Sequence, residues 1–103
     1  MLNPLPTTLN AAVDFVIASF TDKDRRRLAT HRERWLGGID THYGPWTVEQ
    51  CFGAASGNPE LLSALGAQHA FGARGWIIQG VRRRLEGQSI DYELEPVGLR
   101  WKD

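Results

Sequence analysis

Two runs of three consecutive arginines, at positions 25–27 and 82–84, are the side chains in this sequence best suited to contact another molecule. Arginine forms planar, bidentate hydrogen bonds with carboxylates and phosphates, so either run could recognise an acidic group. Arginine outnumbers lysine ten to two in the chain, although a genomic preference for arginine codons would produce the same bias.

The two runs occupy different places in the predicted helices. Residues 82–84 fall in the last turn of one helix, where cations complement the negative end of the helix dipole, so a structural role explains them. Residues 25–27 fall near the start of another helix, where positive charge is unfavourable. Arg27, His31 and Arg34 also follow one another at helical spacing as a polar stripe. The first run is therefore the better candidate for a partner contact.

Aromatic side chains are the second class of candidates, because tyrosine and tryptophan anchor many protein interfaces. In so small a domain they also form the natural core. We expect Trp46 and Trp76 in the core and leave both readings open for Trp101. The predicted partner-binding residues are Arg25, Arg26, Arg27, Arg34, Tyr92 and Trp101.

No group of residues has the spacing of a catalytic or metal site. His31, His42, His69 and Cys51 are metal-ligand types, but no pair of them shows a recognisable ligand spacing. The chain also has no Gly-x-Ser-x-Gly, P-loop or dinucleotide-binding pattern. We predict no catalytic residue, no metal site and no cofactor, and we do not expect an enzyme.

Length and charge favour a single cytoplasmic domain, residues 1–103. The 103 residues are 42% hydrophobic and 23% charged, an ordinary globular composition. The zero net charge sums basic segments at 21–36 and 74–86 with an acidic one at 37–73, which weighs against an overall footprint for nucleic acid. The lone cysteine forms no internal disulfide, and we see no signal peptide and no apolar run of ~20 residues.

Five helices are predicted to position these side chains, at residues 8–20, 22–36, 48–55, 59–65 and 70–86. The first carries a continuous apolar stripe at helical spacing, and the second a thin one. Thr21 is the predicted N-cap of the second helix and Asn58 that of the fourth. The two glycines at 37 and 38 predict the end of the second helix, and the segment from there to residue 46 reads as a loop. Three glycines in the last helix suggest close approach of a neighbouring element.

After Gly87 the apolar residues alternate, which is typical of a strand. The sequence from Glu95 to Gly98 is typical of a turn, so we predict a short hairpin or an extended tail. An isolated hairpin is marginal in water, so its apolar face must pack on the helices or on a partner. That partner could be a second copy of the chain, which would form a homodimer.

The order of several short motifs resembles a family of small bacterial domains of unknown function. The resemblance covers residues 6–86, and two departures are Phe71-Gly72 in place of two acidic residues and Arg32-Glu33-Arg34 in place of a glycine-rich stretch. It implies a helical fold and no particular reaction. The motifs are Pro6-Thr7-Thr8-Leu9, His31 followed by Ile39, a turn at Tyr43-Gly44-Pro45-Trp46, Gly57-Asn58-Pro59-Glu60-Leu61-Leu62, and a helix from His69 to Leu85.

We therefore predict a mainly α fold, a compact bundle of four to five helices over residues 6–87 with a β-like segment at 88–103. The predicted function is a small cytoplasmic interaction protein that binds another macromolecule, as inhibitors, immunity proteins and phage counter-defence proteins do. The alternative is a nucleic-acid-binding protein that uses the arginine-rich second helix.

Overall fold

A computed structural model of the chain describes residues 5–53, 57–96 and 98–102. These residues form a mainly α fold with a small C-terminal hairpin, as the sequence predicts. Its elements are α1 (Leu9–Ala18), α2 (Asp22–Thr30), α3 (Arg32–Gly37), α4 (Ile39–Phe52), α5 (Pro59–Ala64), α6 (Ala70–Leu85), β1 (Tyr92–Leu94) and β2 (Leu99–Trp101).

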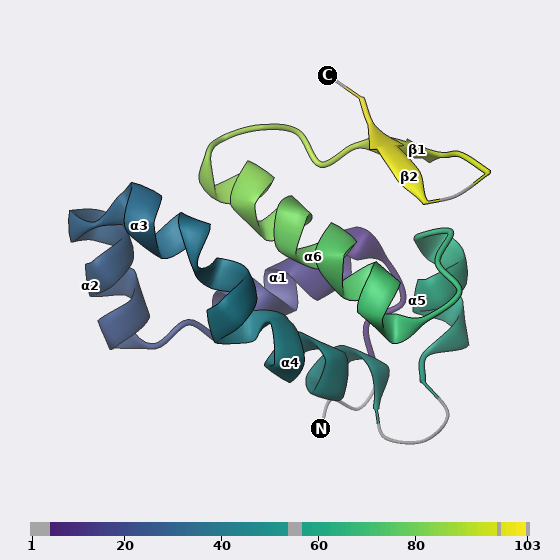
Figure 1. The fold of residues 1–103 in the computed structure, drawn as a ribbon, viewed down its shortest axis with the longest axis horizontal. Coiled ribbons are helices and arrows are strands. Elements are labelled where there is room, and N and C mark those ends of the chain that lie inside the picture. The colour runs from purple at the N-terminus through teal and green to yellow at the C-terminus, as the bar shows by residue number, and fades with distance from the viewer. Residues whose placement is uncertain (1–4, 54–56, 97, 103) are drawn as a thin grey trace.

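The centre of the fold is α6, which packs against both α1 and α4 (Figure 1). The predicted stripe of α1 supplies Val13 and Val16 to this core, and α6 supplies Ile77 and Val81, all fully buried. Burial of each such side chain stabilises the fold by ~1.5–3 kcal/mol. The three helices therefore form the body from which the other elements project.

The glycines of α6 do not all have the role that the sequence suggests. A Cβ atom at Gly80 would lie 2.8 Å from Cγ2 of Val13, so this glycine permits the close approach of α1. Gly72 and Gly75 face open space, and for these two the prediction of a close neighbour is wrong.

The predicted second helix is two helices. Thr21 caps α2 through a capping box with Asp24, as expected, but α2 ends at Thr30 and α3 begins after His31. His31 has φ −136° and ψ 51°, outside the helical region. At this break the chain changes direction, from α2, which buries no side chain, to α3, which buries Trp35 and Leu36. A single straight helix would direct both segments along one axis.

The segment predicted as a loop, residues 37–46, is mostly helical, and this prediction is wrong. Helix α4 starts at Ile39 and continues through Pro45, and Gly38, with φ −97°, is not a left-handed cap. Ile39, Tyr43 and Trp46 recur at helical spacing, so a helix packs all three against the core. Trp46 is half-buried there. The predicted helical end at residues 54 and 55 lies outside the described residues.

Asn58 joins three segments of the chain and confirms its predicted role as a helix cap. Its Oδ1 accepts from the backbone N–H of Leu61, 3.3 Å away, at the start of α5. Its Nδ2 donates to the carbonyl of Pro6 at 2.5 Å and to that of Cys51 at 3.1 Å. This buried amide therefore fixes the N-terminal segment and the end of α4 against α5.

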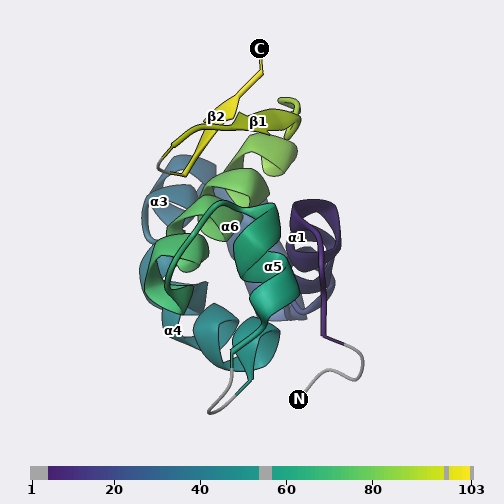
Figure 2. The ribbon, with the colours of Figure 1, turned by 90° about the vertical axis from the view of Figure 1, so that its right-hand side faces the viewer.

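The C-terminal tail folds back on the helices of its own chain, one of the two arrangements that the sequence leaves open. Strands β1 and β2 pair antiparallel, with Tyr92 opposite Trp101, and the hairpin lies across α6 (Figures 1 and 2). Leu99 is only 4% exposed. The Tyr92 hydroxyl donates to the carbonyl of Ala64 at 2.7 Å. Helices α5 and α6 cover one face of the hairpin, so this face does not need a partner molecule.

Within the described ranges, no helix combines the length and the apolar character that a membrane crossing requires.

Candidate functional site

Helices α2 and α3 form an arm, residues 22–37, at one end of the molecule, far from the hairpin in Figure 1. The arm is anchored by α3: Trp35 is 4% exposed and meets Phe20 edge-on, with ring centroids 5.0 Å apart. Arg32 adds a hydrogen bond to the carbonyl of Leu85 at the end of α6. In contrast, α2 buries none of its residues and packs mainly against α3.

A hydrogen-bond network fixes where the arm begins. Asp24 accepts from the backbone N–H of Thr21 at 3.0 Å and from the Tyr43 hydroxyl of α4. Partial burial by itself raises the pKa of the Asp24 carboxyl, but the hydrogen bonds from Tyr43 and Thr21 outweigh it and lower that pKa overall. Burial, and then the bond to Asp24, raises the pKa of Tyr43. Asp24 is therefore the charged acceptor and Tyr43 the neutral donor that lock α2 to α4.

Three of the four predicted arginines on the arm have no partner within the part of the chain that the structure describes. Arg26, Arg27 and Arg34 are exposed, and their guanidinium groups form no ion pair or hydrogen bond with a described residue. Arg25 is also exposed, and its Nη2 lies 3.4 Å from the carbonyl of Ile17. The arm thus presents cations that the fold does not use.

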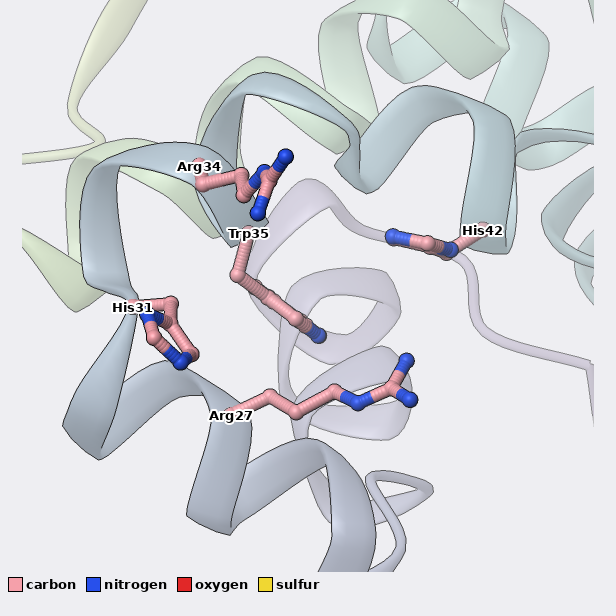
Figure 3. Close-up of a pocket in the computed structure, with 5 residues that line it drawn as sticks. All are labelled: Arg27, His31, Arg34, Trp35 and His42. Atoms are coloured by element: carbon pink, nitrogen blue, oxygen red, sulfur yellow. The ribbon is translucent and has the colours of Figure 1, made fainter.

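A hollow of about 480 Å³ opens beside α3 and gathers five side chains. Arg27 comes from α2, His31 from the break, Arg34 and Trp35 from α3, and His42 from α4 (Figure 3). The rings of Trp35 and His42 are nearly parallel, with centroids 6.0 Å apart. The predicted polar stripe is therefore one wall of a concave site, whereas Arg25 and Arg26 lie outside it.

His42 and Trp35 are the residues of this hollow that sequence reasoning missed. His42 was expected only to cap, pack or face solvent, because it shares no metal-ligand spacing with the other histidines or with Cys51. In α4, His42 lies about one helical turn after Ile39. Only the packing of α4 against α3 brings His42 to the arm. The aromatic spacing of α4 was the available signal for the helix.

The second arginine run is engaged by the chain itself. Arg84 pairs with Asp14 and donates to Oδ1 of Asn10 at 2.8 Å, both on α1. Arg83 donates to the carbonyl of Ser89 at 2.7 Å, and its guanidinium carbon lies 5.0 Å from the Trp101 ring centre. Arg82 is exposed in the last turn of α6, where the helix dipole favours it.

Tyr92 and Trp101, the other two predicted partner-binding residues, both contact the chain's own helices. Trp101 is half-buried against Trp76, and its indole N–H donates to Gln79 at 3.1 Å. Trp76 is half-buried as well, and both rings pack against the core. The structure therefore does not bring these aromatics together with the arginines of the arm.

Among the described residues, no three His, Cys, Asp or Glu side chains come together as a metal site. Cys51 is fully buried, and burial raises the pKa of its thiol to about 12. His69 precedes α6 and makes no side-chain cap.

Comparisons with protein-family models, with curated proteins and with solved structures find no match to this chain, so the resemblance to a family of small bacterial domains stays a prediction.

Proposed function

We propose that this chain is an interaction protein that binds an acidic surface of another protein through the arm. The observation that carries the proposal is the composition of α2, which buries no side chain yet presents Arg25, Arg26 and Arg27 to solvent. Arg25 and Arg26 lie at mid-helix and Arg27 in the last turn of α2, not at the helix start that the sequence predicts, and these adjacent like charges repel one another. A partner with carboxylates at this surface would offset that cost.

A protein partner fits the charges of the whole chain better than a nucleic acid does. The net charge is zero, and the segment 37–73, which includes α4 and α5, carries three acidic residues and no lysine or arginine. A nucleic acid that tracked beyond the arm would meet these carboxylates, whereas a protein interface is sized to a patch of ~800 Å² per partner. The alternative is a nucleic acid whose phosphates contact the arm alone, and the experiment must distinguish it from a protein partner.

Binding would act by covering a surface of the partner, because what α2 offers is an exposed charged surface. This is how cytoplasmic inhibitors, immunity proteins and phage counter-defence proteins act, and we place the chain in that class. The charge complementarity would raise the association rate and make it fall with salt.

The test compares two variants that each remove three positive charges. One is Arg25→Gln/Arg26→Gln/Arg27→Gln on the arm, and the control is Arg82→Gln/Arg100→Gln/Lys102→Gln on α6 and the hairpin. All six side chains are exposed. Each variant and the wild type would be immobilised and exposed to lysate of the organism that makes the protein, with and without nuclease treatment, at low and at 0.5 M salt.

We expect a stoichiometric protein retained by the wild type and the control and lost with the arm variant. Equal retention by all three proteins would contradict a role for the arm. Retention that disappears after nuclease treatment would replace the protein partner with a nucleic acid, and a gel shift with a steep salt dependence would then follow.

A further inference from the structure

We propose that the hollow lined by Arg27, His31, Arg34, Trp35 and His42 binds the phosphate group of a small phosphorylated molecule. This inference does not depend on the protein partner of the arm, because the hollow is concave and lies beside the outward-facing Arg25 and Arg26.

The chemistry of the lining selects an anion. Every side-chain heteroatom around the hollow is a nitrogen, as Figure 3 shows, and no carboxylate, hydroxyl or amide oxygen lines it. Arginine has five N–H donors and no acceptor, the indole has a donor only, and each imidazole offers at least one donor. A ligand without acceptors would leave these donors unpaired, whereas phosphate oxygens accept from several at once.

Trp35 provides a specific donor inside the hollow. Its side chain is 4% exposed, yet its indole N–H donates to no described residue. Figure 3 places the indole nitrogen on the side of the ring that faces the Arg27 guanidinium. The indole nitrogen is not among the fully buried unpaired polar atoms of the described residues, so a bound oxygen in the hollow can reach this donor.

The charge and the size fit a phosphate monoester. Arg27 and Arg34 are permanently charged and unpaired, which matches the charge of about −2 on a phosphate monoester. The volume of about 480 Å³ exceeds that of a phosphate and lies in the range of small-molecule sites, ~300–1,000 Å³. The organic part of the ligand would occupy the remainder, beside the stacked faces of Trp35 and His42.

Asp24 is the carboxylate that acts on this region, and its charge interacts with His42. It does not line the hollow, and it already accepts from Tyr43 and Thr21. Its charge therefore reduces the positive potential on the His42 side and leaves Arg27 and Arg34 as the principal phosphate contacts.

The indole N–H signals in a nitrogen–proton NMR spectrum of the full chain provide the test. The chain has four tryptophans, and a Trp35→Phe spectrum assigns the signal of Trp35. Inorganic phosphate, glycerol phosphate, adenosine monophosphate and adenosine would each be titrated at low ionic strength. We expect the three phosphates to shift the Trp35 signal saturably and to leave the Trp101 signal, which is bonded to Gln79, in place.

The matched variants remove the same two charges from the same arm. Arg27→Gln/Arg34→Gln should weaken phosphate binding at least 10-fold, and Arg25→Gln/Arg26→Gln should leave it within 2-fold, because only the first pair lines the hollow. Circular dichroism melting of both variants establishes that they fold.

The proposal is overturned if phosphate produces no saturable shift, if adenosine alone shifts the Trp35 signal as strongly as its phosphate does, or if both variants weaken binding equally. The last outcome would show attraction by the general charge of the arm. Tighter binding of adenosine monophosphate than of glycerol phosphate assigns the ligand as a nucleotide, and equal binding assigns the phosphate as the whole determinant. Both of these results support the site.

Discussion

The two arginine runs have the same three residues and different contacts with the rest of the fold. Residues 82–84 end α6, and two of them bind α1 and the hairpin: Arg84 pairs with Asp14, and Arg83 contacts Ser89 and Trp101. Residues 25–27 span the middle and the last turn of α2, and among the described residues only Arg25 of the three reaches an acceptor, the carbonyl of Ile17 at 3.4 Å. The comparison teaches that the neighbouring elements within reach of a run, and not its composition, decide whether the fold uses it.

The largest expected effect comes from removing the hairpin that contacts the second run. Deletion of residues 88–103 uncovers the core beside α6 and removes the contacts of Arg83 with Ser89 and Trp101. Because Ile90 and Leu99 are buried, we expect the free energy of unfolding to fall by more than about 3 kcal/mol, at ~1.5–3 kcal/mol for each side chain. Thermal melting followed by circular dichroism measures the change.

Leu99→Ala tests the same packing in the full chain and should cost ~2–5 kcal/mol. A truncated chain that melts at the wild-type temperature, or a neutral Leu99→Ala, would show that the hairpin is not part of the core. The second run would then be as free as the first.

A smaller effect is expected from Asp24, which orients the first run. Asp24→Asn weakens the capping box and the acceptor of Tyr43, so urea denaturation at pH 7 should show a loss of about 1 kcal/mol. The pKa of Asp24 in the folded state is below its ordinary value of 3.8. Its stabilisation is therefore present above pH 3.8 and is lost as the pH falls through the folded-state pKa.

The difference in unfolding free energy between wild type and Asp24→Asn should accordingly shrink between pH 7 and pH 3. A difference that stays constant, or grows on acidification, would mean that the charged carboxylate does not hold the start of α2. Tyr43→Phe is the control variant, because it removes one hydrogen bond and keeps the capping box.

The smallest effect is expected at the surface pair of Arg84 and Asp14. A double-mutant cycle with Arg84→Gln and Asp14→Asn should give a coupling energy of about 0.5 kcal/mol, since exposed ion pairs contribute ~0.2–1 kcal/mol. The coupling should decrease in 0.5 M salt. A coupling of zero at low salt would show that the ion pair with Asp14 does not stabilise the fold and would leave Asn10 as the contact of Arg84 on α1.

Local signals predicted most of the helices, because each is set by neighbouring residues. The apolar stripe of α1, the cap at Thr21 and the cap at Asn58 all appear where the sequence places them. The loop predicted at 37–46 is wrong because Gly37 and Gly38 end one helix without preventing another from starting at Ile39, and because Pro45 is exposed and tolerated within α4.

The candidate site was predictable only in part. Arg27, His31 and Arg34 share a stripe that helical spacing predicts, even though His31 interrupts the helix. His42 comes from a different helix, so its place beside Trp35 depends on tertiary packing that one sequence does not specify. Whether Tyr92 and Trp101 contact a partner or the chain's own helices likewise depends on which element covers the hairpin.

The unfolding free energies of two triple variants test the central contrast most directly. Arg25→Gln/Arg26→Gln/Arg27→Gln should unfold within about 0.5 kcal/mol of the wild type, because all three side chains are exposed and their one hydrogen bond to a described residue is the long bond of Arg25 to the Ile17 carbonyl. Arg82→Gln/Arg83→Gln/Arg84→Gln should lose about 2 kcal/mol, because it removes the contacts to α1 and to the hairpin. Equal losses in urea denaturation, or a larger loss for the first variant, would show that the fold itself needs residues 25–27 and would contradict their reservation for a partner.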